Sequence, residues 1–314
     1  MKTCKNCGKP WIPYKGKCLY CGADMSDAPE TTETVDMPDR RILRPNILYR
    51  DAPMSNFEIM TDTKKQYESN PELIEAVRNS IKRQYMVSHE ENIDQPAAVL
   101  SNTMYVCSGK RSFEAAKVYQ GQKTVVLNFA NNRYIGGNPF YANAQEEALC
   151  RCSTLLPCLE AMRDPFYNKH KMQIRNGEMS FIGNDDLIYT PDVVVFKTDD
   201  RTEPPQMMDP GEWYKVDVIT SAAPEMFRSE GFPREDYVNI ITSRIKKILD
   251  VAAKEKNEVL ILGKWGCGAF MNDPKVVSSA FYSQLKNYSF DTVEFALATN
   301  DDVSYSVFAP KTKS

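Results

Sequence analysis

The distribution of apolar and polar residues predicts buried strands that alternate with helices. Short apolar runs of this kind are typical of strands that are covered on both faces. With helices between them, such strands form a sheet that lies between two helical layers. We therefore expect an α/β domain, with strands at residues 124–129, 193–196, 216–220, 259–262 and 293–297.

Helical periodicity marks several of the segments between these strands. Residues 71–86 begin with a proline and an acid, and Leu73, Val77 and Ile81 repeat at intervals of four. This pattern predicts a surface helix with one buried stripe. Further helices are expected at residues 112–120, at 236–256, and at 146–162 with an interruption near Pro157.

Length and composition divide the chain into three parts. A chain of 314 residues with 42% hydrophobic side chains is long enough for one large domain and a small appendage. Residues 28–43 are rich in Pro, Thr and Asp and show no hydrophobic period, so we expect a linker there. The expected parts are a small unit at residues 1–27, the linker at 28–43 and the main domain at 44–314.

Charge and cysteine content restrict the class of protein. The net charge of -3 and the pI near 5.7 argue against a globally basic nucleic-acid binder, although a local basic patch remains open. No apolar run approaches about 18 residues and no signal peptide is recognisable, so we expect a soluble, cytoplasmic protein. The nine cysteines fit metal binding and free thiols better than a disulfide framework.

The first 27 residues have the pattern of a zinc ribbon. Cys4 and Cys7 form one CxxC pair, Cys18 and Cys21 form another, and each pair is followed by glycine. Four thiolates at this spacing suit one tetrahedral zinc ion, which would contribute much of the folding free energy of so short a unit. A rubredoxin-like iron site and a redox dithiol are the alternatives. The unit is rich in lysine and aromatic residues, so it either contacts a nucleic acid or protein or is a docking module with solvated charges.

A glycine pair and two adjacent acids follow the strand expected at residues 124–129. Gly136 and Gly137 lack Cβ atoms, so a sugar or phosphate can approach their N–H groups closely. Glu146 and Glu147 come shortly afterwards, at the start of a helix. Adjacent helical residues point about 100° apart, so we expect one acid and one substrate-holding residue rather than a face-to-face pair.

A second glycine-rich loop follows the strand expected at residues 259–262. Gly263, Gly266 and Gly268 precede Asp273 and Pro274, which together indicate a helix start. A strand, a glycine loop and a helix N-terminus in this order suit a diphosphate, although a plain tight turn fits as well. Neither the dinucleotide motif nor a P-loop is present. Two such loops at strand ends favour a ligand site.

Four segments together have the pattern of a known family. They are LNFANNRYIGGNPFYANAQEEALCRCSTL (127–155), YTPDVVVF (189–196), VDVITSAAPE (216–225) and LILGKWGCGAFMNDP (260–274). The chain thereby resembles the poly(ADP-ribose) glycohydrolase family, in particular its microbial-type catalytic domain, a relative of the macrodomain. The resemblance implies a macrodomain-like three-layer α/β/α fold with a mixed central sheet. It also implies a hydrolase that cleaves the ribose glycosidic bond of ADP-ribose modifications without a catalytic metal.

The resemblance also implies roles for individual residues. Glu147 takes the position of the catalytic general acid and base, Glu146 that of its ribose-holding neighbour, and Asn131 that of a ribose-positioning asparagine. Asn138 stands where the family has a third glycine, which puts substrate fit and polymer preference in question. Asparagine tolerates left-handed backbone angles better than most residues. The implied ligand-binding residues are Asn131, Gly136, Gly137, Asn138, Gln145, Gly266, Cys267, Gly268, Ala269 and Phe270.

Two other functions remain open at this point. One is a reader module that binds ADP-ribose without turnover, and the other is a mono-ADP-ribosyl hydrolase that acts on nucleic acid. The expected partners are ADP-ribose or poly(ADP-ribose), and an ADP-ribosylated protein or nucleic acid that contacts the zinc ribbon. Cys150, Cys152 and Cys158 are expected to be buried small hydrophobic residues. The two histidines, His89 and His170, are expected in loops, which makes a histidine-based triad improbable.

Overall fold

The structure is a computed structural model that describes residues 2–3, 10–11, 55–93, 103–200, 203–228, 232–299 and 301–310. The chain divides into two compact units, Met1–Ala52 and Pro53–Ser314. Within the first unit, β1 (Lys2–Thr3) pairs with β2 (Pro10–Trp11) in an antiparallel ribbon. The four cysteines of the predicted zinc ribbon and the predicted linker lie outside the described residues. Zinc binding by this unit therefore stays a prediction.

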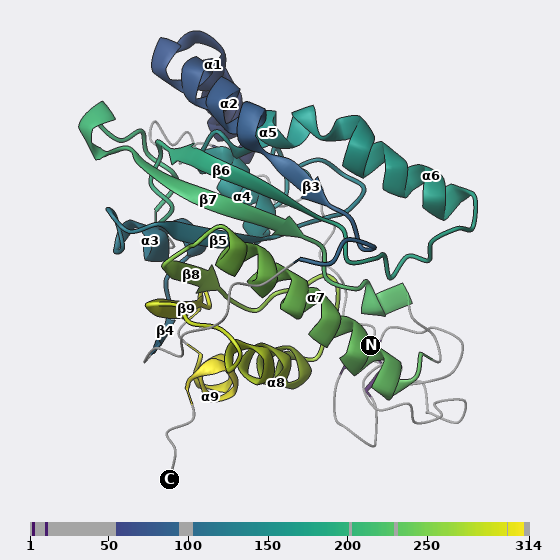
Figure 1. Cartoon of the computed structure of the whole chain (residues 1–314). Helices are drawn as coiled ribbons and strands as arrows, with labels where there is room; N and C mark the ends of the chain where they lie inside the picture. Colours follow the sequence, from purple (N-terminus) through teal and green to yellow (C-terminus); the bar gives the residue numbers. More distant parts are fainter. Residues whose placement is uncertain are drawn as a thin grey trace. The chain divides into compact units, whose positions relative to one another are not determined.

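The second unit is built on one mixed sheet of seven strands (Figure 1). Five strands run parallel to one another, whereas β6 is antiparallel to β7 and β3 is antiparallel to β6. This mixed sheet confirms the predicted α/β fold. The strands in their order across the sheet are β3 (Tyr85–Val87), β6 (Leu187–Val195), β7 (Tyr214–Ser221), β5 (Thr124–Phe129), β8 (Val259–Leu262), β9 (Thr292–Ala296) and β4 (Met104–Ser108).

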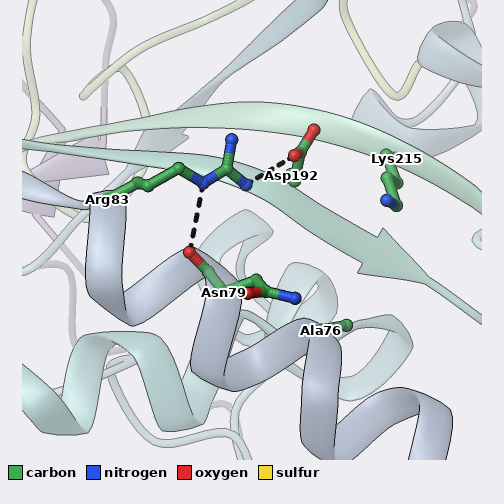
Figure 2. A pocket seen from close by; sticks show the side chains of 5 residues that line it. All are labelled: Ala76, Asn79, Arg83, Asp192 and Lys215. Carbon is green, nitrogen blue, oxygen red and sulfur yellow. Dashed lines mark hydrogen bonds and ion pairs between the residues drawn. The ribbon is translucent and has the colours of Figure 1, made fainter.

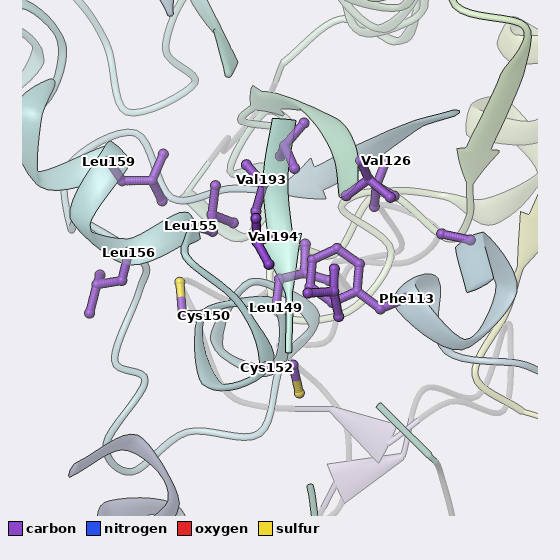
Figure 3. Close-up of a cluster of buried hydrophobic side chains, with 14 of the residues drawn as sticks. Phe113, Val126, Leu149, Cys150, Cys152, Leu155, Leu156, Leu159, Val193 and Val194 are labelled. Carbon is purple, nitrogen blue, oxygen red and sulfur yellow. The ribbon is translucent and has the colours of Figure 1, made fainter. Parts of the chain in front are cut away.

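Helices cover both faces of the sheet because the central strands are apolar on both faces. In β5, Val126 belongs to one core cluster, while Val125 and Leu127 belong to the other, as alternation along a strand requires. The first cluster includes side chains of the helices α1 (Asn56–Ser69), α2 (Pro71–Arg83), α3 (Ser112–Lys117), α4 (Gln145–Cys152) and α5 (Leu155–Ala161) (Figure 3). The second includes side chains of α7 (Arg234–Lys254), α8 (Pro274–Leu285) and α9 (Asp302–Phe308).

The predicted helix at residues 71–86 is shorter than its pattern indicated. It ends at Arg83, and Tyr85–Val87 forms β3 against β6 instead. The predicted stripe is also only partly correct, because Leu73 is fully buried whereas Ile81 is 36% exposed. Pairing with a strand that lies about a hundred residues later in the chain overrides the local helical period.

The helix α2 lies beside β6 at a small polar pocket (Figure 2). The guanidinium of Arg83 forms an ion pair with Asp192 of β6 at 2.5 Å, and Ser80 donates a hydrogen bond to the carbonyl of Asp192. Asp192 has a left-handed φ of 52° at a register shift in β6. Lys215, near the start of β7, completes the lining of this pocket.

The predicted helix at residues 146–162 is interrupted earlier than expected. α4 ends at Cys152 and α5 begins at Leu155, so the break falls at Ser153 and Thr154 rather than at Pro157. Thr154 exchanges hydrogen bonds with the backbone of Val194 in β6, which draws the chain away from the helix. Pro157 lies in the first turn of α5, where its missing N–H has no helical partner to lose.

A π-helical turn, Arg163–Asn168, leads from α5 towards α6 (Lys169–Arg175). His170 lies in α6 and is fully buried, so the prediction of a loop position for this histidine is wrong. Cys150, Cys152 and Cys158 are fully buried, as predicted. No helix within the described ranges is long and apolar enough to cross a membrane.

Candidate active site

Three loops meet at the carboxyl ends of the parallel strands β5, β7 and β8, which are neighbours in the sheet. Phe129, at the end of β5, packs against Gly263 in the loop after β8. Arg133, in the loop after β5, forms an ion pair with Glu225 in the loop after β7. The N–H of Met226 donates to the carbonyl of Phe270 at 2.9 Å and joins the loops after β7 and β8. The two predicted glycine loops therefore lie at one edge of the sheet.

Two buried glutamates occupy the first turn of α4 at this edge. Glu146 and Glu147 are 3% and 7% exposed. Glu146 Oε2 accepts a hydrogen bond from the N–H of Asn131 at 2.9 Å, and its Oε1 accepts one from the side chain of Asn128 at 3.2 Å. Glu147 Oε1 accepts from the N–H of Asn138 at 3.0 Å. Within the described part of the chain, Glu147 Oε2 is buried and has no hydrogen-bond partner, so its capacity to form a hydrogen bond is unused.

The environment of Glu146 favours its protonated form. Burial raises the pKa of Glu146 to about 8, the hydrogen bonds from Asn131 and Asn128 offset part of this increase, and the nearby charge of Glu147 adds to it. Glu146 therefore holds a proton at neutral pH and can donate a hydrogen bond.

Gly137 brings the main chain up to both carboxylates. Its φ of 65° lies in the left-handed region, as does the φ of 63° at Gly136. A Cβ atom on Gly137 would lie 2.3 Å from Glu147 Oε1 and 3.4 Å from Glu146 Oε2. The two adjacent side chains thus approach the same main-chain position.

Asn138 follows two glycines, a place where a left-handed backbone could be expected. Its φ is not in the left-handed region. The left-handed non-glycine residues in the described ranges are Asp192, Lys256, Met271 and Ala298. Asn138 is exposed, and its N–H holds Glu147. Its side chain therefore faces solvent at the edge of the site, where it can affect which substrates fit.

The side chains of Asn131 and Gln145 form hydrogen bonds with backbone groups of the site. Asn131 Oδ1 accepts from the N–H groups of Arg133 and Tyr134 at 2.9 and 3.0 Å. Gln145 accepts from the N–H of Phe129 at 2.8 Å and donates to the carbonyl of Leu127 at 2.8 Å. Gln145 thus joins the start of α4 to the end of β5, which gives it a positioning role in this geometry.

Close packing aligns the second glycine loop with the loop after β7. A Cβ atom on Gly266 would lie 2.3 Å from the Cβ of Ala223 and 2.5 Å from Nδ2 of Asn272. This Nδ2 donates to the carbonyls of Gly266 and Pro224, at 3.0 Å each. The loop ends at α8, where the side chain of Asp273 accepts from the N–H of Lys275, as the sequence predicted.

The remaining predicted residues of this loop differ in exposure. Gly268 and Ala269 are exposed, whereas Phe270 is half-buried and packs against Phe227 with ring centroids 6.5 Å apart. Burial raises the pKa of the Cys267 thiol to about 12, so it is not a thiolate nucleophile at neutral pH.

Sequence reasoning missed Asn128, Arg133 and Glu225. Asn128 is fully buried and supports Glu146, and its only signal was a polar residue inside an otherwise apolar strand. The ion pair of Arg133 and Glu225 left no sequence signal, because the two residues are 92 positions apart. The pocket of Figure 2 lies elsewhere, since Lys215 is near the start of β7 and the site is at its end.

The mixed sheet lies between two helical layers and has two glycine loops and two buried acids at its carboxyl edge. Residues 55–198 match the family model of the microbial-type PARG catalytic domain. PARG is poly(ADP-ribose) glycohydrolase. The second unit has the fold of bacterial poly(ADP-ribose) glycohydrolases.

Several solved structures are similar to this chain. Poly(ADP-ribose) glycohydrolase from Thermomonospora curvata matches with 25% identity and a TM-score of 0.70, over 81% of this chain and 98% of that chain. The same enzyme bound to the inhibitor ADP-HPD matches with 27% identity and a TM-score of 0.67, over the same shares. The Deinococcus radiodurans enzyme in complex with ADP-ribose matches with 26% identity and a TM-score of 0.64, over 74% of this chain and 95% of that chain. No curated protein sequence matches this chain.

Proposed function

We propose that this protein is a poly(ADP-ribose) glycohydrolase, a hydrolase that cleaves the ribose glycosidic bond of ADP-ribose modifications. The family domain at residues 55–198 and the fold shared with bacterial enzymes of this activity support the proposal. Relatives bound to ADP-ribose and to ADP-HPD support an ADP-ribose ligand for this site.

One observation carries the proposal: Glu147 Oε2 is buried without a hydrogen-bond partner in the described residues. The other oxygen of the same carboxyl, Oε1, lies next to Gly137. Cleavage of a glycosidic bond passes through an oxocarbenium-like transition state, so an acid must protonate the leaving oxygen and its carboxylate must then activate water. In this proposal Glu147 enters the reaction in its protonated form, gives this proton to the leaving oxygen through Oε2 and then activates water as the carboxylate, while the N–H of Asn138 fixes its other oxygen.

The neighbouring groups receive supporting roles in this mechanism. Glu146, held by Asn131 and Asn128, presents a proton to the ribose hydroxyl groups. The loop at residues 266–270 binds the diphosphate through backbone N–H groups, next to the N-terminus of α8.

The test is release of free ADP-ribose from polymer by Glu147→Gln. Removing a general acid and base lowers rates by about 10²- to 10⁴-fold, so we expect kcat to fall by this much while ADP-ribose affinity changes only a few-fold. Glu160→Gln is the matched control, because Glu160 is exposed on α5, and it should keep wild-type activity.

Two outcomes would contradict the proposal. Equal release by Glu147→Gln and the wild type would remove Glu147 from its role. Binding of ADP-ribose without release from polymer, modified protein or modified nucleic acid would instead identify a reader module.

For residues 1–27, the predicted zinc ribbon, we propose one structural zinc ion bound by Cys4, Cys7, Cys18 and Cys21. The five lysines and two aspartates of residues 1–27 favour contact with an acidic surface, such as an ADP-ribosylated protein or nucleic acid. This charge is the observation that favours removal of single ADP-ribose groups from nucleic acid as a second candidate function. Comparing release from modified nucleic acid with release from polymer tests it.

A further inference from the structure

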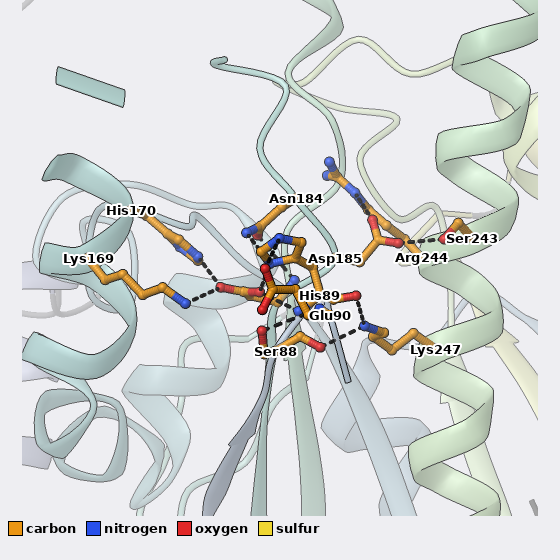
Figure 4. A network of polar contacts seen from close by, with 11 residues as sticks. Ser88, His89, Glu90, Lys169, His170, Asn184, Asp185, Ser243, Arg244 and Lys247 are labelled. Carbon is orange, nitrogen blue, oxygen red and sulfur yellow. Dashed lines mark hydrogen bonds and ion pairs between the residues drawn. The ribbon is translucent and has the colours of Figure 1, made fainter. Parts of the chain in front are cut away.

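His170 contacts two hydrogen-bond acceptors. It belongs to a network of polar contacts that also includes Lys169 and His89 (Figure 4). The ring is fully buried in α6. Its Nε2 lies 2.9 Å from Asp186 Oδ2, and its Nδ1 lies 3.1 Å from the carbonyl oxygen of Asn132. The ring of Phe166 packs edge-on against it at 4.3 Å.

Both of these partners can only accept a hydrogen bond. A backbone carbonyl has no proton to donate. Burial of Asp186 opposes its ionisation, but hydrogen bonds from His170 and His89 and the charge of His170 outweigh burial and hold the pKa of Asp186 well below its usual range. Asp186 is therefore a carboxylate. Each ring nitrogen of His170 must carry a proton, so the ring is an imidazolium.

Asn132 connects this buried cation to the active site. It directly follows Asn131, whose N–H donates to Glu146 Oε2. The side chain of Asn132 is packed against Gly183, since a Cβ there would lie 2.8 Å from its Nδ2. We propose that the His170 imidazolium is a positioning residue for hydrolysis: it holds the carbonyl of Asn132 and thereby fixes Asn131 and Glu146. This role rests on the proposed function.

Other charged groups surround the pair of His170 and Asp186. Asp186 also accepts from Lys169 of α6 at 3.2 Å, from the N–H of His89 at 2.6 Å and from His89 Nδ1 at 2.9 Å. From α7, Arg244 contacts Asp185 at 3.2 Å, and Lys247 donates to the carbonyls of Ser88 and His89. Asp186 thus has several donors besides His170, which favour its carboxylate form.

Arg244, which lies next to this network, contacts the loop after β7. Arg244 is 2% exposed and donates to the carbonyls of Ala222 and Ile182 at 2.9 and 2.8 Å. Two buried cations, His170 and Arg244, therefore fix two of the three loops at the site. A neutral ring would point a nitrogen lone pair at one of its two acceptors and would lose that hydrogen bond.

Nitrogen NMR of the histidine rings tests the protonation state directly. The chain has only two histidines, so ¹⁵N-labelled histidine together with His89→Gln assigns the His170 signals. We expect both ring nitrogens of His170 to be protonated at neutral pH. A neutral ring with one protonated nitrogen at that pH would overturn the proposal, whether or not the protein hydrolyses polymer.

Kinetics test the positioning role. The single amide group of His170→Gln cannot donate in both directions, so we expect kcat/KM for polymer to fall by about tenfold or more. Met172→Ala is the control, because Met172 is 62% exposed on the same helix, and it should keep the wild-type rate. A wild-type kcat/KM in His170→Gln would exclude the positioning role.

A second variant covers the case in which His170→Gln does not fold. Asp186→Asn removes the anionic acceptor at Nε2, so the ¹⁵N spectrum should show a neutral His170 ring and kcat/KM should fall, because the ring no longer donates in both directions. A neutral ring with a wild-type kcat/KM would exclude the positioning role. ADP-ribose affinity is measured in parallel: weaker binding by the His170 variant, with no hydrolysis by the wild type, would overturn the proposed function but leave the contact of His170 with the loop of Asn132 in place.

Discussion

Glu146 and Glu147 are adjacent and similarly buried, but different contacts hold them. Glu146 has donors on both oxygens, whereas only one oxygen of Glu147 has a partner in the described residues. The first arrangement suits a residue that holds the substrate, and the second suits a residue that exchanges a proton with it. The proposed division of roles thus rests on hydrogen bonding and not on burial.

Stability should depend on pH through Glu146. Its folded pKa of about 8 lies above its ordinary value of 4.5, so at pH values between the two the unfolded chain ionises this carboxyl while the folded protein retains the proton. The contribution is fully present below the ordinary value and is lost as pH rises through the folded pKa, at a rate of up to about 1.4 kcal/mol for a rise in pH of one. Thermal unfolding at a series of pH values should therefore show the wild type losing stability relative to Glu146→Gln as pH rises. Parallel curves for the two proteins would contradict this assignment.

Gly137→Ala should impair catalysis more than folding. The new Cβ would lie 2.3 Å from Glu147 Oε1 and would displace the flexible carboxyl. We expect kcat to fall by about 10²-fold, because small displacements of a catalytic group are costly. Gly177→Ala is the matched control: its φ of 75° imposes a similar backbone strain of about 1 kcal/mol, with no atom within 4 Å of the new Cβ. Similar kcat values in the two variants would show that Gly137 does not position Glu147.

At the scale of elements, the site depends on how the loops pack and not only on where the strands end. The loop after β8 is held by Asn272 and by contact of Gly266 with Ala223. The loop after β5 is held by Gln145 from α4 and through Asn132 by His170 from α6. Each loop thus receives its position from a neighbouring element.

The second loop offers a matched pair of glycines that tests this packing. Gly266→Ala should lower the unfolding temperature, because its Cβ would lie 2.3 Å from the Cβ of Ala223 at a left-handed φ of 70°. The expected loss is on the order of 2 kcal/mol, from strain and overpacking together. Gly268→Ala should keep nearly the wild-type unfolding temperature, since no atom lies within 4 Å of its Cβ. Equal unfolding temperatures would argue against close packing at Gly266.

At the scale of the whole molecule, the chain divides into two compact units, Met1–Ala52 and Pro53–Ser314. In our proposal the predicted zinc ribbon lies in the first unit, and every proposed catalytic and ADP-ribose-binding residue lies in the second. Loss of the metal should therefore leave the chemistry at Glu147 intact.

Replacement of Cys4 and Cys7 by serine tests this separation. Elemental analysis should find one zinc per wild-type chain and none in the double variant, because a site with two thiolates no longer closes the tetrahedron. Hydrolysis of free polymer should remain within about twofold, since the proposed mechanism uses no metal. Cys107→Ser, in the second unit, should retain the zinc. Wild-type protein free of metal, or loss of polymer hydrolysis in the double variant, would contradict the prediction.

Local signals were sufficient for much of the fold and for part of the site. The apolar runs predicted β5 and β8 with their observed bounds, and Asp273 with Pro274 predicted the start of α8. Gly136 and Gly137 have the left-handed backbone that favours glycine. These features depend on neighbouring residues only, through side-chain alternation, capping and backbone freedom.

Contacts between distant residues decided the rest. β3 exists because it pairs with β6, and the break between α4 and α5 exists because Thr154 bonds to β6. The burial of His170 depends on Asp186 and Asn132, which come from different segments. Buried polar groups need partners, and a fold can bring those partners from anywhere in the chain. The sequence therefore showed the residue types and the glycine positions. The hydrogen bonds that distinguish Glu146 from Glu147 were visible only in the folded structure.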